Sequence, residues 1–172
     1  MKKFAFSLLM IALLLASRSL TGQSSSKESG PAQKSIAITF DNLPAEPTNR
    51  AAERNEINRL ILSSLKKNEI KAAGFVVGEF INKDWELIAR WLDDGHVIGS
   101  LPYSGQRIDD VPLPFFFDDI IKGRDILENL LDSYEQKGRY FRLPYLYAVG
   151  SPSNRKELYA LLRNEKLTLV DA

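Results

Sequence analysis

Short apolar runs alternate with longer amphipathic stretches along most of this 172-residue chain, and this alternation restricts the possible folds more than any other feature. Strands are predicted at residues 35–40, 72–77, 96–100, 140–142 and 167–170. Apolar residues three and four positions apart predict helices over 51–67 and 84–93, a third whose periodic apolar positions run from 120 to 134, and a fourth that begins near 154. Because strands that alternate with helices form parallel sheets, we expect an α/β fold with about five parallel strands and flanking helices.

The first 34 residues have a different character. Lys2 and Lys3 precede an apolar run over residues 4–16, which is too short to span a bilayer and is typical of a secretory signal. We predict a signal peptide at 1–22, a flexible Ser- and Gly-rich linker at 23–34, and one domain at 35–172. The protein is then expected to be exported, either to the periplasm or out of the cell. It would contact a membrane only through an uncleaved signal segment.

Composition excludes several classes of protein. The chain has no Cys, so its fold cannot depend on disulfides and it cannot be a lipoprotein. Its formal net charge is +1, from 23 basic and 22 acidic residues. Removal of Lys2, Lys3 and Arg18 with the signal leaves 20 − 22, or −2. Because there is no basic stripe, nucleic acid is not expected as a partner.

Polar residues mark the places where three predicted strands end. Residues 36–44 read Ile-Ala-Ile-Thr-Phe-Asp-Asn-Leu-Pro, residues 95–105 read Gly-His-Val-Ile-Gly-Ser-Leu-Pro-Tyr-Ser-Gly, and residues 141–145 read Phe-Arg-Leu-Pro-Tyr. In parallel α/β folds the functional residues gather at the carboxyl ends of the strands. Asp41, Asn42, Leu101 and Arg142 are predicted to lie at such ends.

Together these three segments resemble the polysaccharide deacetylase (NodB-homology) family, whose metal-dependent members remove acetyl groups from amino sugars. The family pattern reads T-F-D-D, then H-T-x-S-H, then R-x-P-Y or R-x-P-F. The resemblance implies a partial (β/α) barrel over residues 35–172. It covers about two thirds of a typical family domain, because the later D-x-W and L-x-H motifs are missing. We therefore expect a degenerate, C-terminally truncated member of the family.

The resemblance also implies roles for individual residues. Asp41 matches the catalytic base of the family, and Arg142 matches the arginine that holds that base. Pro144 and Tyr145 match the segment that lines the substrate groove, and Tyr103 lies in a loop that can face the same groove. Without the family, Asp41 would be interpreted as a strand-ending residue that hydrogen-bonds the next turn.

The metal ligands of the family are not conserved in this chain. Their positions carry Asn42, Leu101 and Gly105, of which only Asn42 offers an oxygen, whereas a catalytic zinc site needs about three N, O or S ligands. We therefore expect no metal cofactor, although the family uses a divalent metal such as zinc. Replacement ligands are conceivable from two adjacent acidic pairs, although such pairs are usually solvated: Asp109, Asp110, Asp118 and Asp119.

Other candidate residues have simpler interpretations. His96 is the only histidine, and a single His in an apolar strand is expected to be a hydrogen-bonded packing residue. The run Phe115, Phe116 and Phe117 opens an amphipathic stretch and is predicted to be core. Tyr147 can face either the groove or the core. The last helix is predicted to have Asn154 as its N-cap, with Glu157 three residues later.

Three functional hypotheses follow. The first is an inactive deacetylase-like protein of carbohydrate metabolism, from a family that hydrolyses N-acetyl C–N bonds on amino sugars. The second is a non-catalytic glycan-binding or scaffold protein of the cell envelope, and the third is an active hydrolase with rebuilt metal ligation. The expected partner is an acetylated glycan or peptidoglycan. An open barrel edge could also mediate oligomerisation.

Overall fold

The computed structural model describes residues 35–45, 50–147 and 149–171. The chain divides into two units, Met1–Ser35 and Ile36–Ala172, and every helix and strand described belongs to the second. The predicted signal peptide and linker lie outside the described residues. Within the described part, no helix combines the length and the apolar character needed to cross a membrane.

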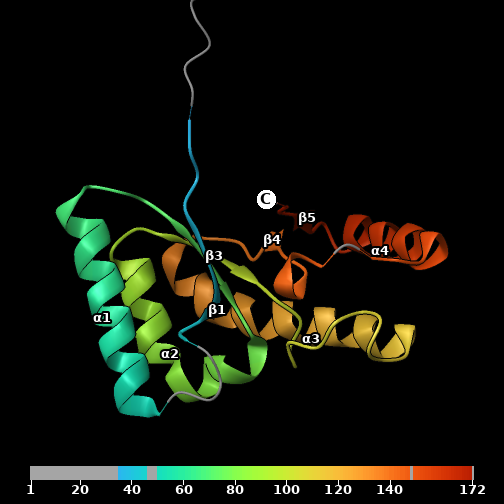
Figure 1. The fold of residues 1–172 in the computed structure, drawn as a ribbon, viewed down its shortest axis with the longest axis horizontal. Helices are drawn as coiled ribbons and strands as arrows, with labels where there is room; N and C mark the ends of the chain where they lie inside the picture. Colours follow the sequence, from blue (N-terminus) through green and yellow to red (C-terminus); the bar gives the residue numbers. More distant parts are fainter. Residues whose placement is uncertain (1–34, 46–49, 148, 172) are drawn as a thin grey trace, which may run out of the picture. The chain divides into compact units, whose positions relative to one another are not determined.

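A parallel five-stranded sheet runs through the centre of the second unit (Figure 1). Its order is the order of the chain, β1-β2-β3-β4-β5. The α/β prediction with five parallel strands is confirmed. The strands are β1 (Thr39–Leu43), β2 (Ala73–Val76), β3 (Val97–Ser100), β4 (Tyr140–Phe141) and β5 (Thr168–Leu169).

Four α-helices connect these strands, and two short 3₁₀ turns lie beside β4. Apolar residues of the first three helices pack with Val76 and Ile98 of the sheet in one cluster, which contains the fully buried Trp91. A second cluster joins the start of the third helix to the fourth around Phe141. The elements are α1 (Ala51–Lys67), α2 (Gly78–Asp93), α3 (Leu113–Leu131), η1 (Asp132–Tyr134), η2 (Pro144–Leu146) and α4 (Pro152–Asn164).

Two predicted boundaries are wrong. The first strand begins at Thr39 and not at 35, because β2 offers partners only from Ala73 onward and the exposed Ile36 lies outside the sheet. Helix α2 begins at Gly78 and not at 84. Asp84 has φ −129° and ψ 26°, which interrupts the helix, so the regular spacing in the sequence resumes only after it.

The ends of the later helices also differ from the prediction. The N-cap of α4 is Ser151, whose Oγ accepts a hydrogen bond from the Asn154 N–H at 3.4 Å. Pro152 occupies the first helical position, where its fixed φ and missing N–H are tolerated. In α3 the core prediction is right for the buried Phe116 and wrong for Phe115, which is 48% exposed.

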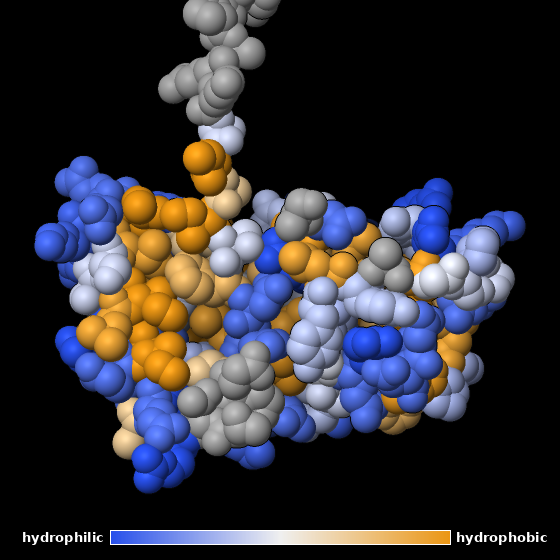
Figure 2. Space-filling model, in the orientation of Figure 1, coloured by the Kyte–Doolittle hydropathy of each residue, from blue (hydrophilic) through white to orange (hydrophobic). Residues whose placement is uncertain are grey.

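An apolar area covers part of one face (Figure 2). The exposed apolar residues of the described part include Ile36 and Ile38, which precede β1, and Leu60 of α1. Leu60 also lines a shallow cavity of about 380 Å³ together with Phe40 and Ile61. Because β1 pairs only with β2, its other side is an open edge among the described strands. The predicted oligomerisation through this edge stays a prediction.

Candidate functional site

Arg142 occupies the centre of the candidate site. It follows β4 directly and is only 3% exposed. Its Nη1 donates to Asp41 Oδ1 and to Thr39 Oγ1, both at 2.8 Å, and its Nε donates to the Val170 carbonyl at 3.2 Å. The guanidinium also lies 4.2 Å from the centre of the Phe75 ring. A single side chain therefore contacts residues on or beside β1, β2 and β5.

Asp41 and Arg142 lie at strand ends, as predicted, but not on adjacent strands. Strands β2 and β3 lie between β1 and β4 in the sheet. The guanidinium can reach Asp41 only because the sheet curves, so that its two edges approach each other as in a barrel. Since a buried cation requires a partner, the pair has a structural explanation whether or not Asp41 acts as a base.

Asn42 lies where β1 becomes irregular. The register of β1 against β2 shifts between Phe40 and Leu43, and Asn42 has φ 57°. Asn tolerates this left-handed conformation better than most residues do. The peptide bond between Leu43 and Pro44 is cis.

Leu101 and Gly105 occupy the two positions where the resemblance implies histidine. Leu101 is 1% exposed and packs with Phe75 and Phe80, while its backbone N–H donates to the Val76 carbonyl at 2.9 Å. Gly105 has φ 72° and closes a tight turn. One position is thus filled by a core side chain and the other has no side chain. This donor set does not fit zinc, which is bound by imidazole, carboxylate or thiolate groups.

The acidic residues considered as replacement ligands do not converge. Asp119 is 5% exposed, and its Oδ2 accepts from the Ser104 N–H at 3.0 Å and from Ser104 Oγ at 2.8 Å. Asp110 pairs with Arg107 at 3.3 Å, and Asp109 and Asp118 are exposed. Within residues 35–45, 50–147 and 149–171, no three His, Cys, Asp or Glu side chains are grouped so that they could hold a metal ion.

Sequence reasoning missed the role of Asp119. It lies among the buried residues Phe116, Ile120 and Gly123 of α3, so an acid on the apolar side of a helix was the available signal. Its two bonds fix the loop after β3 in place, together with the bond from the Tyr103 N–H to the Asp119 carbonyl at 3.0 Å.

The predicted groove residues have different surroundings. The Tyr103 ring is half-buried and has the Lys122 ammonium 3.5 Å from its centre. Tyr145 is 73% exposed with φ 58°, and Pro144 before it is buried. The Tyr147 ring is stacked by Arg107, whose guanidinium carbon lies 4.1 Å from its centre. Of the tyrosines, Tyr145 presents the most open ring, and its role in binding stays a prediction.

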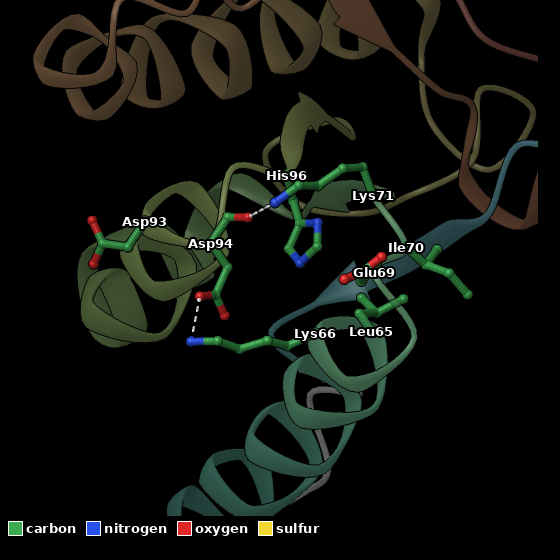
Figure 3. A pocket seen from close by; sticks show the side chains of 8 residues that line it. All are labelled: Leu65, Lys66, Glu69, Ile70, Lys71, Asp93, Asp94 and His96. Atoms are coloured by element: carbon green, nitrogen blue, oxygen red, sulfur yellow. Dashed lines mark hydrogen bonds and ion pairs between the residues drawn. The ribbon is translucent and has the colours of Figure 1, made fainter.

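His96 lies away from this site, before the amino end of β3 (Figure 3). It is 2% exposed, its Nδ1 accepts from the Ala72 N–H at 3.3 Å, and its ring packs edge-on against Trp91. Burial and, to a smaller extent, the nearby Lys71 ammonium lower its pKa. It lines a cavity of about 380 Å³ with Lys66 and Lys71. His96 is therefore a hydrogen-bonded packing residue, as predicted.

Comparison with known proteins gives concordant results. The model of the polysaccharide deacetylase family matches residues 28–167. A peptidoglycan-N-acetylglucosamine deacetylase of Bacillus cereus is 35% identical over 118 residues, which are 68% of this chain and 38% of that protein. The chain thus spans about two fifths of the length of this relative.

Solved structures agree on the fold. A peptidoglycan N-acetylglucosamine deacetylase in complex with 4-naphthalen-1-yl-N-oxidanyl-benzamide superposes with a TM-score of 0.61 at 25% identity, over 78% of this chain and 55% of that one. A CE4 family pseudoenzyme from Bacillus anthracis gives 0.62 at 19% identity, over 83% and 44%. The curved parallel sheet, the buried Arg142 and the match over most of the sequence lead to one conclusion. The chain belongs to the polysaccharide deacetylase (NodB-homology) family.

Proposed function

We propose that this chain is a member of the family that does not catalyse metal-dependent N-deacetylation. The observation that carries the proposal is Leu101, an apolar side chain buried in the core at a position where the family binds metal through histidine. Asn42 and Gly105 complete a set with no imidazole and no carboxylate. With this set of residues, a hydrolytic metal would have no protein site in which to be held.

The energetic consequence of losing the metal is large. Metal coordination lowers the pKa of water from 15.7 to about 7, which corresponds to more than about 10 kcal/mol of easier ionisation. A general base such as Asp41 typically contributes a factor of about 10² to 10⁴, or roughly 3 to 5 kcal/mol. Asp41 therefore cannot replace the metal. What it does in this chain is accept the hydrogen bond of a buried guanidinium.

The partner class comes from the relatives. Two of the relatives are a peptidoglycan-N-acetylglucosamine deacetylase and a peptidoglycan-N-acetylmuramic acid deacetylase. We take an acetylated glycan, peptidoglycan in particular, as the ligand of this protein, and the exported compartment as its location. The fold accommodates such a state, because one solved structure of the same fold is a CE4 pseudoenzyme.

Metal content and acetate release test the proposal together. The full chain is dialysed against Zn²⁺ or Co²⁺, its bound metal is counted, and it is incubated with chitooligosaccharides and with peptidoglycan. We expect far less than one equivalent of metal and no acetate above the background. The Bacillus cereus relative serves as the positive control in the same buffers. One equivalent of metal together with acetate release from this chain would show that the proposal is wrong.

A rescue variant tests the reason given for inactivity. Asn42→Asp, Leu101→His and Gly105→His would restore one carboxylate and two imidazoles. Without metal the variant should melt below the wild type, because Leu101 is buried and a side chain at φ 72° is strained. Zn²⁺ should then bind and raise the melting temperature. If the variant folds but does not bind Zn²⁺, the loss of the three ligand side chains would not be sufficient to explain the loss of the metal site.

A second candidate function is non-catalytic glycan binding, and Tyr145 favours it. Its ring is 73% exposed although its backbone has φ 58°, a conformation held by the bond from the Leu146 N–H to the Leu143 carbonyl at 3.2 Å. Strained, exposed aromatic residues are often found where ligands bind. Cosedimentation of the chain with peptidoglycan tests this, and Tyr145→Ala should reduce the bound fraction. If Tyr145→Ala and the wild type cosedimented with peptidoglycan to the same extent, Tyr145 would not contribute to glycan binding.

A further inference from the structure

A polar cavity with an exposed tryptophan lies beside the interruption in α2. Its volume is about 280 Å³, and it is lined by Asn55 of α1 and by α2 residues that include Asn82, Asp84, Trp85 and Glu86. Trp85 is 52% exposed, whereas the other tryptophan, Trp91, is fully buried. Trp85 therefore presents a large aromatic face to solvent next to several amide and carboxylate groups.

The cavity is held by a specific piece of structure. Asp84 leaves the helical conformation, and its carboxylate pairs with Arg54 of α1 at 3.0 Å. Both side chains are mostly buried, 14% exposed for Arg54 and 10% for Asp84. Such a pair is screened less by solvent than one at the surface, so it fixes the two helices at this point. Trp85 follows Asp84 directly in the chain, so its backbone lies beside this pair.

The cavity lies toward the same end of the sheet as Asp41. Helix α1 follows β1 in the chain and α2 follows β2, and Asn55 and Trp85 are the fifth and eighth residues of these helices. At a rise of about 1.5 Å per residue, Trp85 is about 10 Å along α2 from its start. A polymer that contacts the strand ends could therefore extend along the surface to this cavity.

We propose that this cavity is a binding subsite for one N-acetylated pyranose unit of a glycan chain. The indole of Trp85 would stack on the apolar C–H face of the sugar ring, and Asn82 and Glu86 would hydrogen-bond its hydroxyl and acetamido groups. A mostly polar cavity with an exposed tryptophan among its lining residues is suited to a small, amphipathic ligand. The class of ligand rests on the proposed function; the location does not depend on Asp41 or on any metal.

The tryptophans provide a direct assay. The chain has only two, and Trp91 is shielded, with its Nε1–H donating to Asn58 Oδ1 at 2.7 Å. A change in fluorescence on adding a sugar therefore reports Trp85. We expect titration of the full chain with chitotetraose to shift the emission to shorter wavelength and to protect it from acrylamide. Glucose polymers without acetamido groups, such as cellotetraose, should bind more weakly.

Variants decide whether the cavity is responsible. By isothermal titration, Trp85→Ala should weaken chitotetraose binding at least about tenfold and Asn82→Ala should weaken it less. Tyr159→Ala, which removes a 46% exposed aromatic ring from α4, is the matched control and should bind as the wild type does. Far-UV circular dichroism should be unchanged in all three, because the altered side chains are exposed.

The outcomes separate the two proposals. Unchanged affinity in Trp85→Ala would overturn the subsite and leave glycan binding elsewhere on the protein intact. No binding by the wild type would overturn both the subsite and the glycan-binding candidate, while the metal and acetate measurements would still be interpreted independently. Weaker binding by Trp85→Ala and Tyr159→Ala alike would point to a non-specific aromatic effect and would also overturn the subsite.

Discussion

Replacing Asp41 by Ala should destabilise the protein strongly, because it leaves Arg142 without its charged partner. Arg142 is 3% exposed, and its Nη1 forms an ion pair with Asp41 Oδ1 at 2.8 Å. Breaking a buried pair costs about 3–5 kcal/mol. The Asp41 side chain is 28% exposed, so water can reach the vacated space, and we expect the lower end, about 3 kcal/mol. In a domain of this size that corresponds to a fall in melting temperature of about 9 °C.

Urea unfolding of the full chain, followed by circular dichroism, measures this loss. A double-mutant cycle with Arg142→Met isolates the pair, and we expect the two losses to be non-additive by more than about 1 kcal/mol. The control is Glu56→Ala, which breaks the Glu56–Arg59 pair on α1. That pair is as short, at 2.6 Å, but both side chains are more than half exposed, so no measurable change is expected. If Asp41→Ala cost no more than Glu56→Ala, the structural role assigned to the Asp41–Arg142 pair would be wrong.

Three further predictions concern the core. Because the pKa of His96 is lowered in the folded state, the stability that neutral His96 contributes is fully present above about pH 6.5 and is lost as the pH falls through the folded pKa. The midpoint of urea unfolding should therefore fall between pH 7.5 and pH 5, and His96→Gln should make this midpoint less dependent on pH. Asn58→Leu should lower the free energy of unfolding, measured in urea, by about 1–3 kcal/mol, because the Trp91 Nε1–H loses its acceptor. An unchanged free energy of unfolding would show that this hydrogen bond does not stabilise the fold. Gly99→Ala should lower the melting temperature, because its Cβ would lie 2.8 Å from the Tyr140 carbonyl oxygen, and an unchanged melt would mean that β3 and β4 can separate there.

Local patterns in the sequence predicted most of the fold. Helix α1 is found where its apolar spacing placed it, at Ala51–Lys67, and the five strands occur in the predicted order. The start of α2 was missed because Gly78 is a weak helix former and Asp84 breaks the regular spacing. The N-cap of α4 was placed at Asn154, since it has Glu157 three residues on, but Ser151 followed by Pro152 was the stronger signal.

The candidate site was less accessible to sequence reasoning. The pairing of Asp41 with Arg142 came from the family resemblance, and its catalytic meaning is still a prediction. The contacts of Arg142 with Thr39, Phe75 and Val170 depend on how far the sheet curves, which no local pattern encodes. The exposed Trp85, which directly follows the interruption of α2 at Asp84, was also missed.

The sheet order has a consequence for how the chain acquires its structure during synthesis. Because each strand pairs with the strand before it in the sequence, the sheet can grow by one unit at a time as the chain emerges. The bond between Arg142 and Asp41 is different, since it joins residues 101 positions apart. Contacts of such separation are slow to form, because a long loop must close first. The carboxylate of Asp41 therefore has no Arg142 partner until most of the domain has been made.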